Sequence, residues 1–422
     1  MKHTTSAADA APQTTPVTVR VGSPPALLAV IPHLLGFVPE ASLVVIGTAP
    51  LRDRVKVTLR YDLPDPPDAA LAADIAAHAA GVTGSQRLTA AVAVGYGPET
   101  LVTPLADVLR DALREAGAEL REFLRVQDGR YWSYLCGDVA CCPPGGVPFD
   151  ASAQPAAVAL ASREAPVLAG RAAMAARIAP LGGSTAESMR QATRRAERHV
   201  AQLLGKVRKS ARIGAARQMI AAEGLAAVGK MIAAYRRGGA AATDYEVAWL
   251  TVALKDLRVR DDAWARMDPG HRDAHRRLWT DVVRRAQPGH VAAPASLLAF
   301  VAWQCGDGAL ANVALDRALA DDPGYSMALL LRQVISAGAP PSLARLPMSP
   351  EEVAASYAGL DEAGDEVDGD EVDGDEVDGD EVDGDEVDDE DHEDYADEDD
   401  EDYSHLPNPC PVRYEPDPGD EC

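Results

Sequence analysis

The sequence contains few aromatic residues, few cysteines and no long apolar run. Phe, Trp and Tyr make up 5% of the 422 residues, and only four of them are Phe. Because alanine is abundant, we expect a core of Ala, Val and Leu in which helices pack closely. No segment approaches the roughly 20 apolar residues of a membrane-spanning helix, and the N-terminal residues lack the apolar core of an export signal. We therefore expect a cytoplasmic protein without membrane spans.

The six cysteines are few and unevenly spaced for so long a chain. A small secreted protein held together by disulfides shows a denser and more regular pattern. We therefore expect reduced thiols. Three of them are concentrated in RYWSYLCGDVACCPPGG, residues 130–146.

The formal net charge of −26 is distributed unevenly. Residues 361–422 contain 32 Asp and Glu and one basic residue, Arg413, whereas residues 1–360 carry a net charge of +5. GDEVD occurs five times in succession from Gly364 to Asp388. Like charges at this density repel one another, and few apolar residues oppose chain entropy. The composition predicts a disordered polyacidic tail over residues 346–422.

Residues 17–150 alternate between strand and helix patterns. Apolar or alternating runs predict strands at about residues 18–22, 42–47, 55–63 and 90–97. Helices are predicted from Pro24 to about Leu35 and over residues 67–80 and 98–117. A hairpin over residues 48–54 joins the second and third strands, and Asp128-Gly129 predicts another. The order indicates an α/β domain with a mixed sheet, preceded by a flexible leader over residues 1–16.

Residues 151–345 contain only helical patterns, which predicts a second, all-α domain. Near its end, two helical segments flank a glycine turn at Cys305-Gly306-Asp307. Ala311, Leu315, Ala318 and Pro323 follow at the spacing of the second half of a tetratricopeptide-like helix hairpin. One such unit is present, so the pattern predicts a helix hairpin and not a number of repeats.

A basic helix is predicted over Arg190 to Arg217, with nine Lys and Arg and one Glu. One interpretation is contact with nucleic-acid phosphates, and the other is a solvated helix face. The acidic tail would compete with an anionic partner for this face. The basic residues proposed for nucleic-acid contact are Arg194, Arg195, Arg198, Lys206, Arg208 and Lys209.

Three interpretations are open for the C-x4-C-C pattern of Cys136, Cys141 and Cys142. The first is a zinc site that takes a fourth ligand from elsewhere, namely from Asp138, His33 or Cys305. Against it, we expect the side chains of adjacent cysteines to diverge. The second is redox chemistry, which requires a lowered thiol pKa. The third is a packed structural corner closed by Pro-Pro-Gly-Gly.

Polar residues also gather at the predicted ends of a helix and a strand. His33 and Glu40 lie in PHLLGFVPE, and Arg60 and Asp62 lie in LRYDLP. If these ends converge, one histidine and two carboxylates supply an acid/base set. Capping and ion pairing are the alternative roles.

Several blocks of the sequence resemble one family. They are LLAVIPHLLGFVPEASLVVIG, LRYDLP, DGRYWSYLCGDVACCPPGG, VRDDAW and AFVAWQCGDGALANVALDRALADDPGYSMALLL, spread over roughly residues 17–341. The chain resembles the actinobacterial family known as domain of unknown function 4192. The resemblance implies a shared fold and assigns no activity.

Taken together, these patterns favour a binding or scaffolding protein that uses its helical domain, because helix-pair arrays present partner surfaces. The alternative is an enzyme with a site at the strand ends, near His33, Asp62 and the Cys136–Cys142 corner.

Overall fold

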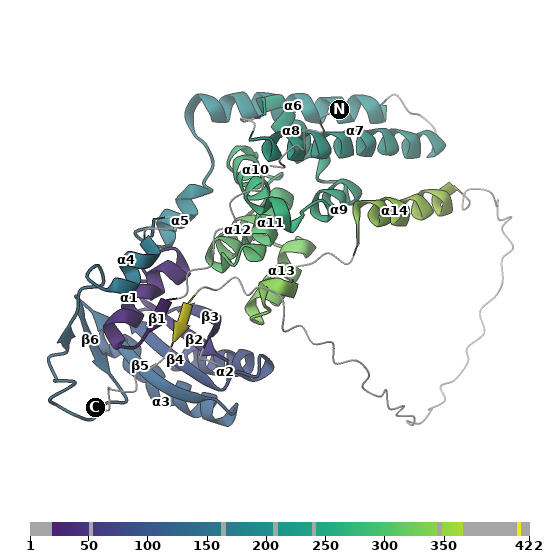
Figure 1. Ribbon diagram of the computed structural model, residues 1–422. Coiled ribbons are helices and arrows are strands. Elements are labelled where there is room, and N and C mark those ends of the chain that lie inside the picture. Colours follow the sequence, from purple (N-terminus) through teal and green to yellow (C-terminus); the bar gives the residue numbers. More distant parts are fainter. Residues whose placement is uncertain are drawn as a thin grey trace, which may run out of the picture.

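A computed structural model describes residues 19–49, 54–161, 166–205, 210–238, 242–343, 348–365 and 412–414. A sheet flanked by helices comes first in the chain, and a larger helical part follows (Figure 1). Among these residues, no helix combines the length and the apolar character needed to cross a membrane.

The main sheet has six strands in the order β3-β2-β4-β5-β6-β7. Only β4 and β5 are parallel, and every other neighbouring pair is antiparallel, which confirms the predicted mixed sheet. A separate parallel pair joins β1, Val19–Val21, to β8, Val412–Tyr414. The strands of the main sheet are β2 (Ser42–Thr48), β3 (Val55–Asp62), β4 (Ala90–Tyr96), β5 (Glu119–Gln127), β6 (Arg130–Ser133) and β7 (Val147–Pro148).

Helices cover both faces of this sheet (Figure 1). Successive side chains of a strand point to opposite faces. In β2, Val44 accordingly packs in the core that includes α1 (Pro24–Leu35) and α4 (Pro155–Ala161), whereas Leu43 packs under α2 (Ala69–Ser85) and α3 (Glu99–Glu115). This double coverage explains why β2 is a continuous apolar run.

The β5–β6 hairpin turns at Asp128 and Gly129, as predicted. Both residues have positive φ, 51° and 71°, the backbone geometry that Asp-Gly adopts most readily in a two-residue hairpin turn. The turn brings β6, and the cysteine-containing segment after it, back alongside β5.

After the sheet, the described elements are helical up to α14. Helix α11 is buried along its whole length, and α11 and α12 pack as a hairpin. Gly306, with φ of 76°, lies in their turn, and Asp307 caps α12 by accepting a hydrogen bond from the Leu310 N–H at 2.9 Å. The α-helices of this part are α5 (Arg171–Arg177), α6 (Gly183–Gly205), α7 (Ser210–Arg236), α8 (Asp244–Ala253), α9 (Leu257–Ala265), α10 (Arg272–Arg285), α11 (Ala292–Gln304), α12 (Gly308–Asp321), α13 (Ser326–Ser336) and α14 (Pro350–Asp365).

The predicted basic helix over Arg190 to Arg217 is two helices. Helix α6 ends at Gly205 and α7 begins at Ser210, and the two lie side by side (Figure 1). Glycine has a low helix propensity, and Gly205 is the residue at which α6 ends. Lys206, Arg208 and Lys209 lie outside the described residues.

The prediction of disorder from residue 346 onward is wrong for α14. Ser349 forms a capping box in which its N–H donates to Glu352 at 2.6 Å and its hydroxyl accepts from the Glu352 N–H at 3.3 Å. Val353 is buried, and the Tyr357 hydroxyl donates to Asp261 on α9 at 2.7 Å. Tertiary contact therefore orders this stretch. The predicted disorder of residues 366–411 and 415–422, and of the leader, lies outside the described residues.

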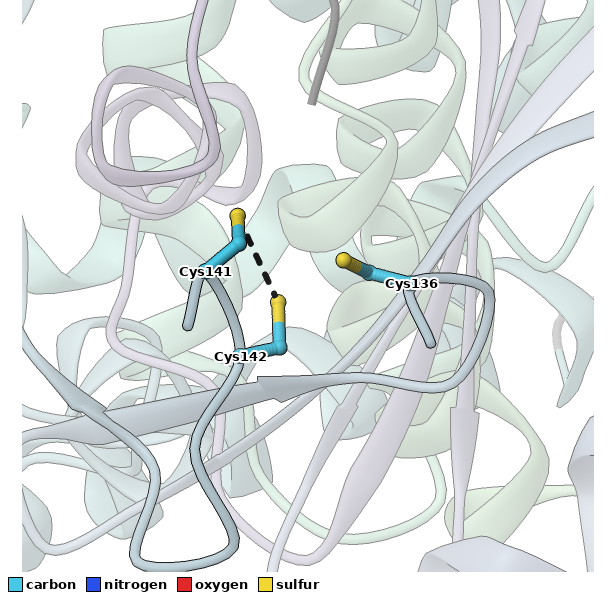
Figure 2. A group of neighbouring side chains, drawn as sticks. All are labelled: Cys136, Cys141 and Cys142. Atoms are coloured by element: carbon cyan, nitrogen blue, oxygen red, sulfur yellow. Dashed lines mark hydrogen bonds between the residues drawn. The ribbon is translucent and has the colours of Figure 1, made fainter. Parts of the chain in front are cut away.

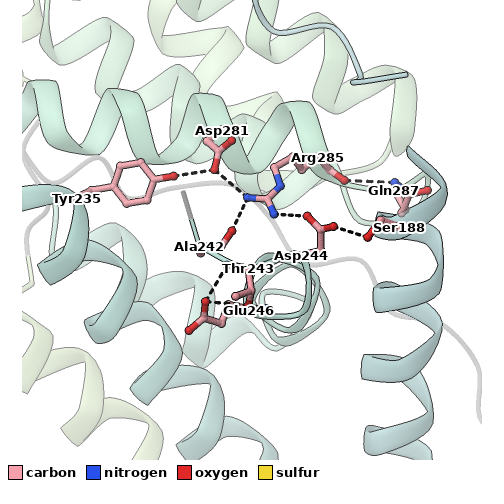
Figure 3. Close-up of polar contacts among 9 residues, drawn as sticks. All are labelled: Ser188, Tyr235, Ala242, Thr243, Asp244, Glu246, Asp281, Arg285 and Gln287. Atoms are coloured by element: carbon pink, nitrogen blue, oxygen red, sulfur yellow. Dashed lines mark hydrogen bonds and ion pairs between the residues drawn. The ribbon is translucent and has the colours of Figure 1, made fainter. Parts of the chain in front are cut away.

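A buried arginine connects four helices of the helical part (Figure 3). Arg285 on α10, 6% exposed, donates to the Ala242 carbonyl at 2.9 Å, to Asp281 at 3.2 Å and to Asp244 on α8. Ser188 on α6 donates to Asp244, and the Tyr235 hydroxyl on α7 donates to Asp281 at 2.7 Å. The hydrogen bond from Ser188 and the nearby guanidinium lower the pKa of Asp244.

Candidate metal centre

Three thiols converge in the loop that follows β6. The sulfurs of Cys136, Cys141 and Cys142 all lie within 4.8 Å of one another, and those of Cys141 and Cys142 are 3.9 Å apart (Figure 2). The three side chains are partly buried, and none of the four cysteines in the described ranges is in a disulfide.

A tight turn brings the two adjacent cysteines together. The Cys142 N–H donates to the Asp138 carbonyl at 2.7 Å, and the Asp138 carboxylate accepts from the Ala140 N–H at 2.8 Å. This closes one helix-like turn over residues 138–142. Our expectation that adjacent cysteine side chains diverge is therefore wrong here, because the turn holds both sulfurs on the side that faces Cys136 (Figure 2).

Ser133, the last residue of β6, positions Cys136. Its hydroxyl oxygen accepts hydrogen bonds from the N–H groups of Leu135, at 3.2 Å, and Cys136, at 3.0 Å. The same hydroxyl donates to Glu122 on β5 at 2.8 Å. Burial raises the pKa of Glu122, although its hydrogen bonds with Ser133 and the Phe123 N–H act in the opposite direction. The hydrogen bonds of Ser133 thus fix the direction in which the chain leaves β6.

The other end of the loop is fixed against Trp132. The indole N–H donates to the Pro144 carbonyl at 2.9 Å, and Arg130 donates to the Gly146 carbonyl at 3.0 Å. Arg125 pairs with Trp132 across the two strands, and its guanidinium lies 3.7 Å from the centroid of the Trp132 ring. Both ends of the cysteine loop are thus held by side chains of the sheet.

Burial raises the pKa of the Cys142 thiol, and its hydrogen bond with Cys136 raises it further. Redox chemistry at neutral pH requires the opposite shift, toward the thiolate. A bound cation reverses this tendency, because a coordinating thiol loses its proton. The raised pKa gives no support to redox chemistry, and metal binding and a packed structural corner both stay predictions.

The proposed fourth ligands are not part of this group. Within the described ranges, the three sulfurs form a group without Asp138, His33 or Cys305. The Asp138 carboxylate is used in the turn, and Cys305 caps the C-terminus of α11, where burial raises its thiol pKa. Three ligands leave one position of a tetrahedron for a ligand from outside the cluster.

Of the residues at the helix and strand ends, the structure brings Arg60 and Asp62 together. Their side chains form an ion pair at 2.7 Å, and the Arg60 guanidinium lies 5.4 Å from the Phe37 ring centroid. Glu40 is exposed in the loop after α1. His33 lies in the last turn of α1, where burial lowers its pKa. A shared acid/base site of these residues stays a prediction.

Three of the six proposed nucleic-acid contacts are described, and all three are exposed on α6. Arg195 lies over the Tyr245 ring at 4.4 Å, and the others are Arg194 and Arg198. Their contact with nucleic acid stays a prediction.

Sequence reasoning missed the residues that shape the cysteine loop. Glu122, Arg125 and Trp132 precede it by up to 14 positions and act through the antiparallel pairing of β5 and β6. The signal that could have found them is the Asp128-Gly129 turn, because the register of a hairpin fixes which residues oppose each other.

Comparison with known proteins gives one match. No curated protein is similar to the chain at a significant level, and no solved structure is. The model of one family, Domain of unknown function (DUF4192), matches residues 24–342, which span the sheet, the cysteine loop and the helices up to the turn after α13. The chain belongs to this family.

Proposed function

We propose that the protein binds zinc through Cys136, Cys141 and Cys142 and presents the fourth coordination position to an exogenous ligand. The convergence of the three sulfurs within 4.8 Å is the observation that carries this proposal. Thiolates are preferred ligands of zinc, and sites with three protein ligands leave one position open.

The spacing of the sulfurs suits a tetrahedral ion. A Zn–S bond of about 2.3 Å places two sulfurs of a tetrahedron about 3.8 Å apart. Cys141 and Cys142 are already at 3.9 Å, and each remaining pair is within 4.8 Å. Each pair of sulfurs is therefore within about 1 Å of the separation that a tetrahedral zinc ion requires.

Rigidity of the loop supports the same proposal. The turn at Asp138, the Ser133 hydrogen bonds and the Trp132 contacts hold the backbone that carries the three thiols. A site whose ligands are positioned in advance loses less conformational entropy when the ion binds.

Three thiolates and Zn²⁺ together carry one negative charge. Strong electron donation by the thiolates makes such an ion a weaker Lewis acid than one held by histidines, so its role is to hold the loop and bind a ligand. Reduced thiols suit a reducing compartment, and we place the protein in the cytoplasm.

The metal content of the purified full-length chain tests this function. We expect about one zinc ion per chain in the wild type, and less than about a tenth of that in Cys136→Ser and Cys142→Ser. Cys305→Ser is the matched control, because Cys305 lies outside the cluster, and it should retain the ion. A zinc content that is equal in all four proteins would refute the proposal.

A second candidate function is partner binding by α13, the helix that follows the α11–α12 hairpin. It is favoured by exposed apolar side chains on α13, with Leu329 46% and Leu330 61% exposed, and Val334 beside them on the helix. We expect a specific partner to be lost from Leu330→Glu and retained by Leu257→Glu, which places the same change at an exposed leucine of α9. Equal retention by both variants would exclude this surface.

A further inference from the structure

A cavity that is open to solvent lies in the helical part, between α7, α9 and the start of α14. Its volume is about 610 Å³, within the range of about 300–1,000 Å³ typical of small-molecule sites. Part of its wall is apolar and includes Ile232, Ala233 and Ala265. The wall also carries charged side chains, and small-molecule sites combine a mainly apolar wall with a few polar groups in this way.

One wall is a chain of three polar side chains. Arg236 Nη2 lies 3.3 Å from His271 Nε2, and His271 Nδ1 lies 2.9 Å from Asp268 Oδ1. Because an arginine only donates, Nε2 accepts, and the proton of a neutral His271 is on Nδ1, from where it donates to Asp268. This chain fixes the orientation of the Asp268 carboxylate, which lines the cavity.

Asp268 lines the cavity with a side chain that is 39% exposed, and the buried His275 lies next to it. Asp268 Oδ2 accepts no hydrogen bond from the described part of the chain, although Arg236 Nη1 is 3.4 Å away. His275 is 1% exposed, neither of its ring nitrogens is hydrogen-bonded to a described residue, and its Nε2 lies 3.9 Å from Asp268 Oδ2. Buried polar atoms are normally hydrogen-bonded. Asp268 Oδ2 faces Arg236 and His275, and the exposed part of the same carboxylate lines the cavity, where it can accept a hydrogen bond from a ligand.

The positive charges of the cavity are compensated to different degrees. Arg266 forms a bidentate pair with the buried Asp262, at 2.6 and 2.9 Å, and Glu351 lies nearby. Arg236 shares its charge with Asp268. Arg237, in contrast, is exposed and forms no ion pair with any described residue. An anionic group at Arg237 and Arg236 would compensate the remaining charge.

We infer that this cavity binds a small organic anion that also carries a hydroxyl or ammonium group. The anion lies at Arg237 and Arg236, the donor group lies at Asp268 beside His275, and the body of the ligand packs on the apolar wall. The inference is independent of the zinc site, because the cavity and the cysteine loop share no residue.

Calorimetric titration of the full-length chain tests the inference with two probes, glycerol phosphate and methyl phosphate. Both carry the anion, and only the first carries free hydroxyls. We expect the wild type to bind glycerol phosphate more tightly. Arg237→Gln should weaken binding of both probes by about tenfold, since a charged hydrogen bond is lost. Arg114→Gln, at an exposed arginine of α3, is the matched control and should bind as the wild type does.

Asp268→Asn tests the contact between the hydroxyl group of the ligand and Asp268 separately from the contact of the anion with the arginines. It should reduce the preference for glycerol phosphate over methyl phosphate while binding of methyl phosphate persists. Equal affinities of Arg237→Gln and Arg114→Gln, or no binding of either probe by the wild type at millimolar concentration, would overturn the inference. The Arg237→Gln comparison decides the matter even where Asp268→Asn does not fold, because Arg237 is exposed and outside the core.

Discussion

Gly146 lies directly against the indole of Trp132. A Cβ atom at position 146 would be 2.5 Å from Trp132 Cε2, closer than any real Cβ contact, and φ at this residue is 73°. The glycine therefore lets the end of the cysteine loop close on the ring that fixes it. The contact between Gly146 and Trp132 thus helps to position the three thiols, although neither residue supplies an atom that would bind the metal.

Gly146→Ala should displace the loop and weaken zinc binding by about tenfold or more, because both the positive φ and the clash with Trp132 disfavour it. Gly129→Ala is the matched control, since its φ is 71° and no atom lies within 4 Å of the new Cβ. The control should cost only about 1–2 kcal/mol of folding free energy and leave zinc affinity unchanged. Competition with a chelator measures the affinities, and equal losses in both variants would contradict the role of Trp132.

Arg285→Met should destabilise the helical part by about 3–5 kcal/mol, because it leaves the partly buried Asp244 and Asp281 without their cation. Arg276→Met on the same helix is the control. Its ion pair with Asp273 is exposed, and its removal should cost less than about 1 kcal/mol. Urea unfolding of both variants measures the difference. Similar losses would show that the network in Figure 3 contributes no more than a surface pair.

His275 should make the protein less stable as the pH falls. Burial lowers its pKa below the ordinary value of about 6.5; Asp268 opposes this shift, and Arg236 and His271 add to it. The unfolded chain therefore takes up this proton at a higher pH than the folded chain does. Its stabilising contribution is present above about pH 6.5 and is lost as the pH decreases, by at most about 1.4 kcal/mol per pH unit.

His275→Leu removes this titration. Urea unfolding at several pH values between about 7.5 and 5 should show a shallower loss of stability in the variant than in the wild type. Identical slopes would show that His275 does not take part in the acid response.

Local patterns predicted most of the fold. Asp128-Gly129 specifies its hairpin within two residues, and the apolar run of β2 indicates a strand covered on both faces. Ser349 and Glu352 also carry a local helix signal, the capping box, but the acidic composition of the following residues outweighed it in the prediction of disorder. A helix start of four residues is easily lost when composition is averaged over a long segment.

The candidate site was less predictable. The sequence singled out Cys136, Cys141 and Cys142 but not their convergence, because convergence depends on the turn at Asp138 and on Trp132 packing across the hairpin. Asp268, His271 and His275 follow one another at intervals of three and four residues, a spacing that places side chains on one side of a helical segment. Their relation to Arg236 on α7 arises only from tertiary packing.

X-ray absorption at the zinc edge, on the full-length protein loaded with one equivalent of zinc, counts and identifies the atoms that bind the ion. The proposal predicts three sulfur neighbours at about 2.3 Å and one oxygen or nitrogen neighbour at about 2.0–2.1 Å. Two sulfurs or fewer would contradict binding by the three converging thiols. Four sulfurs would contradict the open coordination position and show that another cysteine completes the site.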